Sequence, residues 1–142
     1  MLNAFVTAIY DALKGNSSLM TKIGGTVANG YKCYNVIARQ DASLPYITIG
    51  FETGVSIGVF RSLNEMEVCT IYVNIFSNSG SAKEAGDILD LVKAVLDDAN
   101  LTISGYANDL WCKREFVGAV IYDSDIKVWM IPLRYRVLAE KD

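Results

Sequence analysis

The spacing of apolar residues changes abruptly in the middle of the chain. Over residues 65–76 apolar and polar side chains alternate, which is typical of a β-strand with one buried face. From Ser81 onward the apolar residues recur every three or four positions, and this spacing predicts a helix. Ser81 and Glu84 have the spacing of a capping box, which predicts that the helix begins there. The apolar stripe consists of Ala85, Ile88, Leu89, Val92, Val95 and Leu96. Such a stripe typically packs across a sheet.

Two more helical segments are predicted at the start of the chain. The stretch LNAFVTAIYDALK has apolar residues at helical spacing, and Gly15 provides a natural stop after it. Asn16 is placed to cap a short second turn that Gly24 would end.

Strand-like patterns fill most of the remaining sequence. We predict strands within residues 31–37, 44–52, 65–76, 101–104, 111–122 and 127–139. The segment Asp123-Ser124-Asp125 predicts a turn between the last two, and Pro132 suggests that its strand is an edge strand or contains a bulge. The predicted fold class is therefore α+β: a mainly antiparallel sheet of four to five strands with two helices packed on it. At 142 residues we expect a single domain spanning 1–142.

Residues 53–64, TGVSIGVFRSLN, have two glycines and no clear period. They predict either a long loop or a flexible hairpin extension. Long loops are often functional. Phe60 beside Arg61 is compatible with an anchor inserted into a partner, and equally with a loop folded back on its own domain.

The composition argues against several classes of chemistry. The chain has no histidine, which excludes Ser-His-Asp and Cys-His catalysis. Cys33, Cys69 and Cys112 are far apart, so we interpret them as packing residues, with Cys112 beside Lys113 the least implausible reactive thiol. The carboxylates of the pairs Asp97-Asp98 and Asp123/Asp125 are more typical of a helix end and a turn than of a cation site. We predict no catalytic residue, no metal and no cofactor.

The charge and hydropathy of the chain bear on its partners. A net charge of -3 argues against tight DNA binding, which depends on clustered Lys and Arg. No apolar run approaches the length of a membrane helix, and Asp11 precedes every basic residue, unlike in a signal peptide. We expect a protein made in a reducing cytoplasm, with no membrane partner.

The order of these segments resembles the phage tail-completion or tail-terminator family, the head-tail joining proteins. The resemblance spans nearly the whole chain and includes the LPYITIG start at residues 44–50. It is carried by the N-terminal helix followed by IGGTV, LPYITIG, EVCTIYVNIFS, SGSAKEAGDILDLVKAVL and WMIPLRYRVL. Each motif alone has low specificity, and their order and spacing carry the resemblance.

The resemblance implies a non-enzymatic structural role in a phage or prophage virion. It implies a homo-oligomer, a hexameric ring at the head-proximal end of the tail tube, in the neck region. Such a ring binds the last tail tube subunits, stops their polymerisation, and joins a head-completion or connector protein. DNA would pass through without specific binding, which suits an acidic chain. Assembly would take place in the bacterial host cytoplasm.

The segment 53–64 is our candidate for contact with a neighbouring subunit or the tube. The candidate interface residues are Val55, Ile57, Val59, Phe60 and Arg61. Two alternatives stay open at this point. The chain could be another neck or tail component, such as a head-tail connector or tube subunit, or a small α+β ligand-binding or enzymatic domain that uses Cys112 or an acidic cluster.

Overall fold

The structure is a computed structural model that describes residues 2–59 and 62–141, and the side chains of all of these except 57–59, 62–65 and 107–110. Its elements, in chain order, are α1 (Leu2–Lys14), α2 (Ser17–Ile23), the 3-10 helix η1 (Val27–Lys32), β1 (Cys33–Asn35), β2 (Tyr46–Val59), β3 (Ser62–Ser77), α3 (Lys83–Leu96), β4 (Tyr106–Val117), β5 (Ile121–Asp123) and β6 (Val128–Lys141).

The strands form one mixed sheet. Its order is β1-β2-β3-β6-β4, with β5 paired to β6 beyond the end of β4. Only β1 is parallel to its neighbour in the described part of the sheet, and the other pairs are antiparallel. The α+β prediction is confirmed, although the described sheet has six strands rather than four or five.

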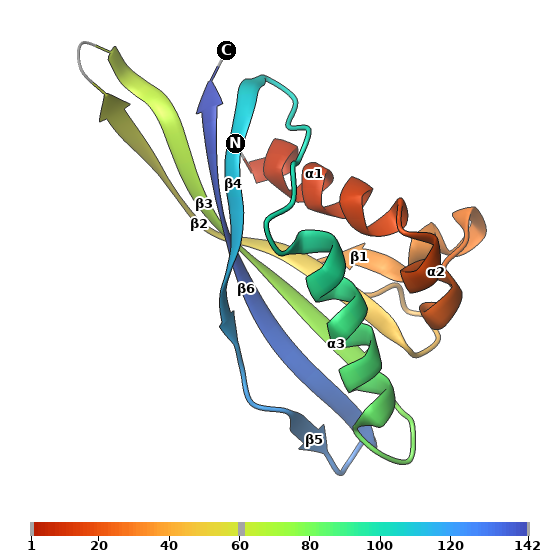
Figure 1. Cartoon of the computed structure of the whole chain (residues 1–142). Helices are drawn as coiled ribbons and strands as arrows, with labels where there is room; N and C mark the ends of the chain where they lie inside the picture. Colours follow the sequence, from red (N-terminus) through yellow and green to blue (C-terminus); the bar gives the residue numbers. More distant parts are fainter. Residues whose placement is uncertain (1, 60–61, 142) are drawn as a thin grey trace.

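All three α-helices lie on one face of the sheet (Figure 1). No described helix covers the opposite face, which we call the uncovered face. The core therefore lies between the helices and the inner face of the sheet. Side chains that alternate along β3 and β6 are fully buried there, as predicted: Cys69, Ile71, Val73 and Ile75 from β3, and Ile131, Leu133, Tyr135 and Val137 from β6.

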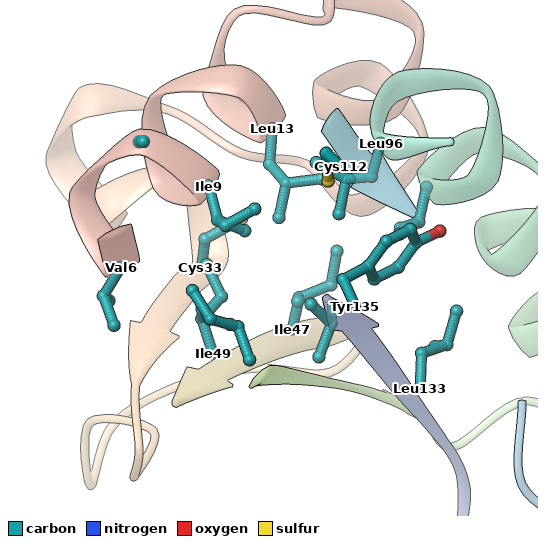
Figure 2. Close-up of a cluster of buried hydrophobic side chains, with 14 of the residues drawn as sticks. Val6, Ile9, Leu13, Cys33, Ile47, Ile49, Leu96, Cys112, Leu133 and Tyr135 are labelled. Atoms are coloured by element: carbon teal, nitrogen blue, oxygen red, sulfur yellow. The ribbon is translucent and has the colours of Figure 1, made fainter. Parts of the chain in front are cut away.

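The stripes of α1 and α3 complete this core. Figure 2 shows Ile9 and Leu13 of α1 directed toward Ile47 and Ile49 of β2, with Leu96 of α3 beside them. All five side chains are 0–1% exposed. Burying an aliphatic side chain of this size stabilises the fold by about 1.5–3 kcal/mol.

The start of α2 was predicted correctly. The Oδ1 atom of Asn16 accepts a hydrogen bond from the N–H of Leu19 at 2.8 Å, which satisfies a free amide of the first turn. Gly24 ends the helix with φ of 75°, a left-handed conformation that glycine adopts without steric cost.

The capping box predicted for α3 is wrong. The residue before the helix is Ala82, and the Ser81 hydroxyl accepts only a long 3.4 Å bond from the N–H of Lys83. The Glu84 carboxylate instead accepts a 2.6 Å hydrogen bond from the hydroxyl of Ser77, at the end of β3. The glutamate therefore ties the helix to the strand, because Ser77 is fully buried beneath it.

The strand predicted at residues 101–104 is also wrong. Leu101 and Ile103 are buried at 8% and 5% exposure, but they belong to the irregular connection between α3 and β4. Their alternation with Thr102 and Ser104 reflects burial without ladder pairing. The segment predicted as one strand over 111–122 is divided between β4 and β5.

Pro132 is not in an edge strand, because β6 lies between β3 and β4. Its carbonyl accepts a 2.8 Å hydrogen bond from the N–H of Gly118. The nitrogen and carbonyl of a strand residue point to the same side, so the missing donor of Pro132 faces residues 118–120, between β4 and β5. The proline therefore occupies an interruption in the neighbouring ladder. The predicted turn at Asp123 is present, since its Oδ1 accepts the N–H of Asp125 at 3.0 Å.

Candidate assembly interface

The segment 53–64 is largely part of a hairpin. β2 pairs with β3 from Tyr46↔Phe76 to Val59↔Ser62, whereas the β6 ladder with β3 begins only at Met66. We call residues 53–59 and 62–70 the β2–β3 arm. It projects past the helices at the upper left of Figure 1. The hairpin alternative is confirmed, and a long loop is excluded for the described residues.

A β-bulge at the base of the arm changes the direction of its side chains. The register passes from Phe51↔Ile71 to Thr53↔Thr70, so Glu52 is the extra residue. One inserted residue exchanges the two faces of a strand. Ile49 accordingly faces the helices, whereas Val55 lies opposite Val68 on the uncovered face and is 61% exposed.

Val55 begins an apolar row across the uncovered face. The ladders align Val55 with Val68, Val68 with Leu138, and Leu138 with Trp111. The side chains of Val68, Leu138 and Trp111 are half-buried. Sequence reasoning missed all three, because cross-strand register is not visible in one strand's pattern. The bulge was hidden for a related reason: Phe51 and Val55 are both odd-numbered and look like one continuous stripe.

Ion pairs hold the base of the arm on both faces. On the uncovered face, Glu52 pairs with Nε of Arg134 at 2.8 Å, and the Arg134 guanidinium lies 5.2 Å from the ring centre of Phe116. On the helix face, Glu67 is 3% exposed and pairs with Nζ of Lys141 at 3.1 Å. The hydroxyl of Tyr106 also donates a hydrogen bond to Glu67. Burial, and then this carboxylate, raise the pKa of Tyr106.

The structure places the predicted interface residues unevenly. Val55 is exposed, and the backbone of Ile57 and Val59 continues β2 opposite Met66 and Ser62. Phe60 and Arg61 lie outside the described residues. Their proposed role in contacts stays a prediction.

The three cysteine thiols singled out from the sequence belong to the hydrophobic core. Cys33, Cys69 and Cys112 are all buried, and burial raises the pKa of Cys33 and of Cys69 to about 12. A thiol with such a pKa is almost entirely protonated near neutral pH, which disfavours nucleophilic chemistry.

The carboxylate of Asp97 makes two contacts within the fold. It accepts a 2.7 Å hydrogen bond from Tyr135 and pairs with Arg114 at 3.2 Å. Within the described residues, no group of three or more Cys, Asp and Glu side chains is placed to hold a metal ion. The helices within the described residues are all too short or too polar to cross a lipid bilayer.

Comparison with known proteins gives a family match and a shared fold. The sequence profile of a family described as Tail completion protein gp17 matches residues 7–140. A chain in the virion of a native gene transfer agent particle superposes with a TM-score of 0.79 at 15% identity, over 97% of this chain and 96% of that one. The gp17 protein of bacteriophage SPP1 superposes with a TM-score of 0.60 at 20% identity, over 95% of this chain and 88% of that one. No curated protein matches the chain at a significant level.

Proposed function

Because this chain belongs to the tail completion protein gp17 family of phage structural proteins, we propose that it closes the head-proximal end of a phage tail tube. In this proposal six copies form a ring in the neck of the virion. The ring binds the last tail tube subunits, stops their polymerisation and offers its other side to a head-completion or connector protein. The role is structural, without turnover or cofactor, and the ring assembles in the bacterial host cytoplasm.

The observation that carries this proposal is the extent of the family match. It runs from residue 7 to residue 140 and so includes most of α1 and all described strand residues except Lys141, the last residue of β6. The net charge of -3 supports a ring through which DNA slides, because an acidic wall does not neutralise phosphates.

The test of this function is the native mass of the purified protein over a wide concentration range, with negative-stain electron microscopy of the same samples. We expect particles of about six subunits, as rings free in solution or on the ends of tail tubes. The protein should also stop the growth of uncapped tubes. A protein that stays monomeric, and that leaves tube ends growing, would contradict the proposal.

The β2–β3 arm is our proposed contact with the tube or with a neighbouring subunit. The residues in question are Val55, Ile57, Val59, Phe60 and Arg61. The support comes from Val55, which is 61% exposed at the start of an apolar row on the uncovered face. Deleting residues 55–63 should abolish tube capping or ring formation. Intact capping by that variant would remove the arm from the interface.

A second candidate function is another neck or tail component, such as a head-tail connector or a tube subunit. One observation favours keeping it: the gene transfer agent chain, with a TM-score of 0.79, is described only as part of a virion. A tube subunit would be incorporated along growing tubes, whereas a completion protein would bind only their ends. Labelled protein imaged on tubes distinguishes the two.

A further inference from the structure

Exposed apolar side chains gather at the two opposite edges of the sheet. Six of the eleven large hydrophobic side chains that are exposed, among those the structure describes, lie beside β4 and β5: Phe116, Val117, Val120, Ile121, Tyr122 and Ile126. We call them the β5-edge patch. Three more, Val27, Val36 and Ile37, lie at the β1 edge and form the β1-edge patch.

The β5-edge patch is presented by a strand with one described partner. β5 pairs with β6 on one side, and its Ile121 and Tyr122 are 48% and 45% exposed. The Asp123 turn that follows holds Ile126 at 66% exposure. Exposed strand edges are normally protected by charges or proline. Over residues 117–123 the single charged residue is Asp123, at the end of β5, whereas the apolar residues Val117, Val120, Ile121 and Tyr122 are exposed.

The β1-edge patch is presented by a strained turn. The N–H of Ile37 donates to the carbonyl of Asn35 at 2.7 Å, which closes a three-residue turn around Val36. Val36 has φ of 66°, a costly conformation for a β-branched residue. This turn ends β1 after three residues and leaves Val36 55% and Ile37 78% exposed. Arg39 donates to the carbonyl of Ala28 at 3.3 Å and so holds η1 beside the turn.

We propose that the β5-edge patch of one copy docks on the β1-edge patch of a second copy. This inference rests on the proposed ring and names the surfaces that would close it. A cyclic ring of more than two copies needs two different patches on each subunit, facing away from each other. The sheet order places β1 at one edge and β4 with β5 at the other, as Figure 1 also shows. A subunit that contacted only the tail tube would need only one of the two patches.

Charge supports the choice of a second copy as the occupant. Asp125 lies in the exposed turn of the β5-edge patch and has no ion pair among the described residues. Among the described residues, Arg39 donates to the carbonyl of Ala28 and lies 5.7 Å from the ring centre of Tyr34, and it forms no ion pair there, not even with the nearby exposed Asp41. Docking would bring the unpaired Asp125 of one copy near the unpaired Arg39 of the next.

Disulfide cross-linking tests the contact directly. The double variant Ile37→Cys with Ile121→Cys would carry one new thiol in each patch, while the three native thiols are buried. Under mild oxidation we expect a covalent ladder that ends at the ring size. An equal mixture of the two single variants should stop at covalent dimers, because each copy then has only one new thiol. Both positions are exposed, so the variants should keep the wild-type circular dichroism spectrum.

The outcomes separate this proposal from the proposed function. Rings seen by microscopy without a ladder would overturn the edge contact and leave tail completion standing. A ladder from a protein that does not cap tubes would support the contact and count against the function. Absence of both rings and ladder, in solution and on tube ends, would overturn the two together.

Charge reversal provides a second test. Arg39→Glu and Asp125→Lys, each alone, should raise the concentration for half-maximal assembly by about tenfold, because each places like charges across the contact. Mixed in equal amounts the two variants should assemble as the wild type does, since opposite charges then meet at every contact. Asp90→Lys, on the exposed side of α3, is the matched control and should have no effect. A mixture that assembles no better than its components would overturn the proposal.

Discussion

The hydroxyl of Tyr135 and the carboxylate of Asp97 together connect three elements. The side chain of Tyr135 is fully buried on the inner face of β6, and the hydroxyl donates to Oδ1 of Asp97, the residue that follows α3. The other oxygen of Asp97 pairs with Arg114 of β4 at 3.2 Å. The end of α3 is thereby attached to β4 and β6.

This cluster predicts a specific pH dependence. Burial, and then Asp97, raise the pKa of Tyr135 above the ordinary value near 10. The folded phenol keeps its proton where the unfolded one loses it, so its contribution is complete below about pH 10 and is lost as pH rises further. Tyr135→Phe should lower the free energy of unfolding by about 1–2 kcal/mol at pH 8. Above about pH 10 the free energy of unfolding of this variant should also fall less steeply with pH than that of the wild type, by up to about 1.4 kcal/mol per pH unit.

Urea unfolding across this alkaline range measures both effects. Tyr122→Phe, in exposed β5, is the control for the loss of one phenol. If the free energy of unfolding fell equally steeply with pH in the wild type and in Tyr135→Phe, the buried hydroxyl would not have a raised pKa.

The thiols make a second prediction at the scale of the residue. Burial raises the pKa of Cys33 and Cys69 to about 12, compared with about 8.5 for a free cysteine, so near neutral pH their thiolate fraction is lower by about three thousandfold. Cys112 is fully buried. We expect alkylation of Cys33 and Cys69 at mildly alkaline pH to be slower by about that factor in the folded protein than in guanidinium. Burial should also slow the alkylation of Cys112, because the reagent cannot reach a fully buried thiol. Rapid labelling of native Cys112, located by mass spectrometry, would instead favour the alternative of a reactive thiol.

At the scale of the element, the start of α3 depends on a residue outside the helix. Ser77→Ala should cost about 1–2 kcal/mol, because it removes the buried donor of the Glu84 carboxylate. Ser81→Ala should change stability by less than about 0.5 kcal/mol, since its bond to Lys83 is long and exposed. Chemical denaturation of the two variants compares them directly. A larger loss of stability in Ser81→Ala than in Ser77→Ala would instead support a capping box at Ser81.

The strands show how far periodicity can be used. It located the buried faces of β3 and β6 because strict alternation over many residues is produced almost only by a half-buried strand. The same rule failed at residues 101–104, where two buried residues alternate within a connection. Four residues are too few to distinguish a strand from a loop that places every second side chain in the core.

At the scale of the whole molecule, we propose that residues 1–142 unfold as one cooperative domain. The two tryptophans report from separate regions: Trp111 lies near the arm, and Trp129 donates to the carbonyl of Ser79, two residues after the end of β3. The variants Trp111→Phe and Trp129→Phe should give fluorescence midpoints that each coincide with the circular dichroism midpoint of the same variant. Separated midpoints within either variant would indicate that the two ends of the sheet unfold independently.

The candidate interface was only partly accessible from the sequence. The composition of residues 53–64 predicted a contact segment, and this stays a prediction; Val55, near its start, is exposed. The apolar row that Val55 begins, and the two edge patches, depend on which strands are neighbours. In one dimension an exposed Ile121 and a buried Ile131 look alike, because burial depends on what packs against the residue.

Local pattern was sufficient for the helices at 2–14 and 83–96, for the strand faces of β3 and β6, and for the α+β class. Each of these depends on interactions among residues a few positions apart, or on one face meeting any core. Tertiary structure alone decided the sheet order, the interior place of Pro132 and the link between Ser77 and Glu84. It also decided the face on which Val55 lies, because the bulge at Glu52 is defined only relative to the partner strand.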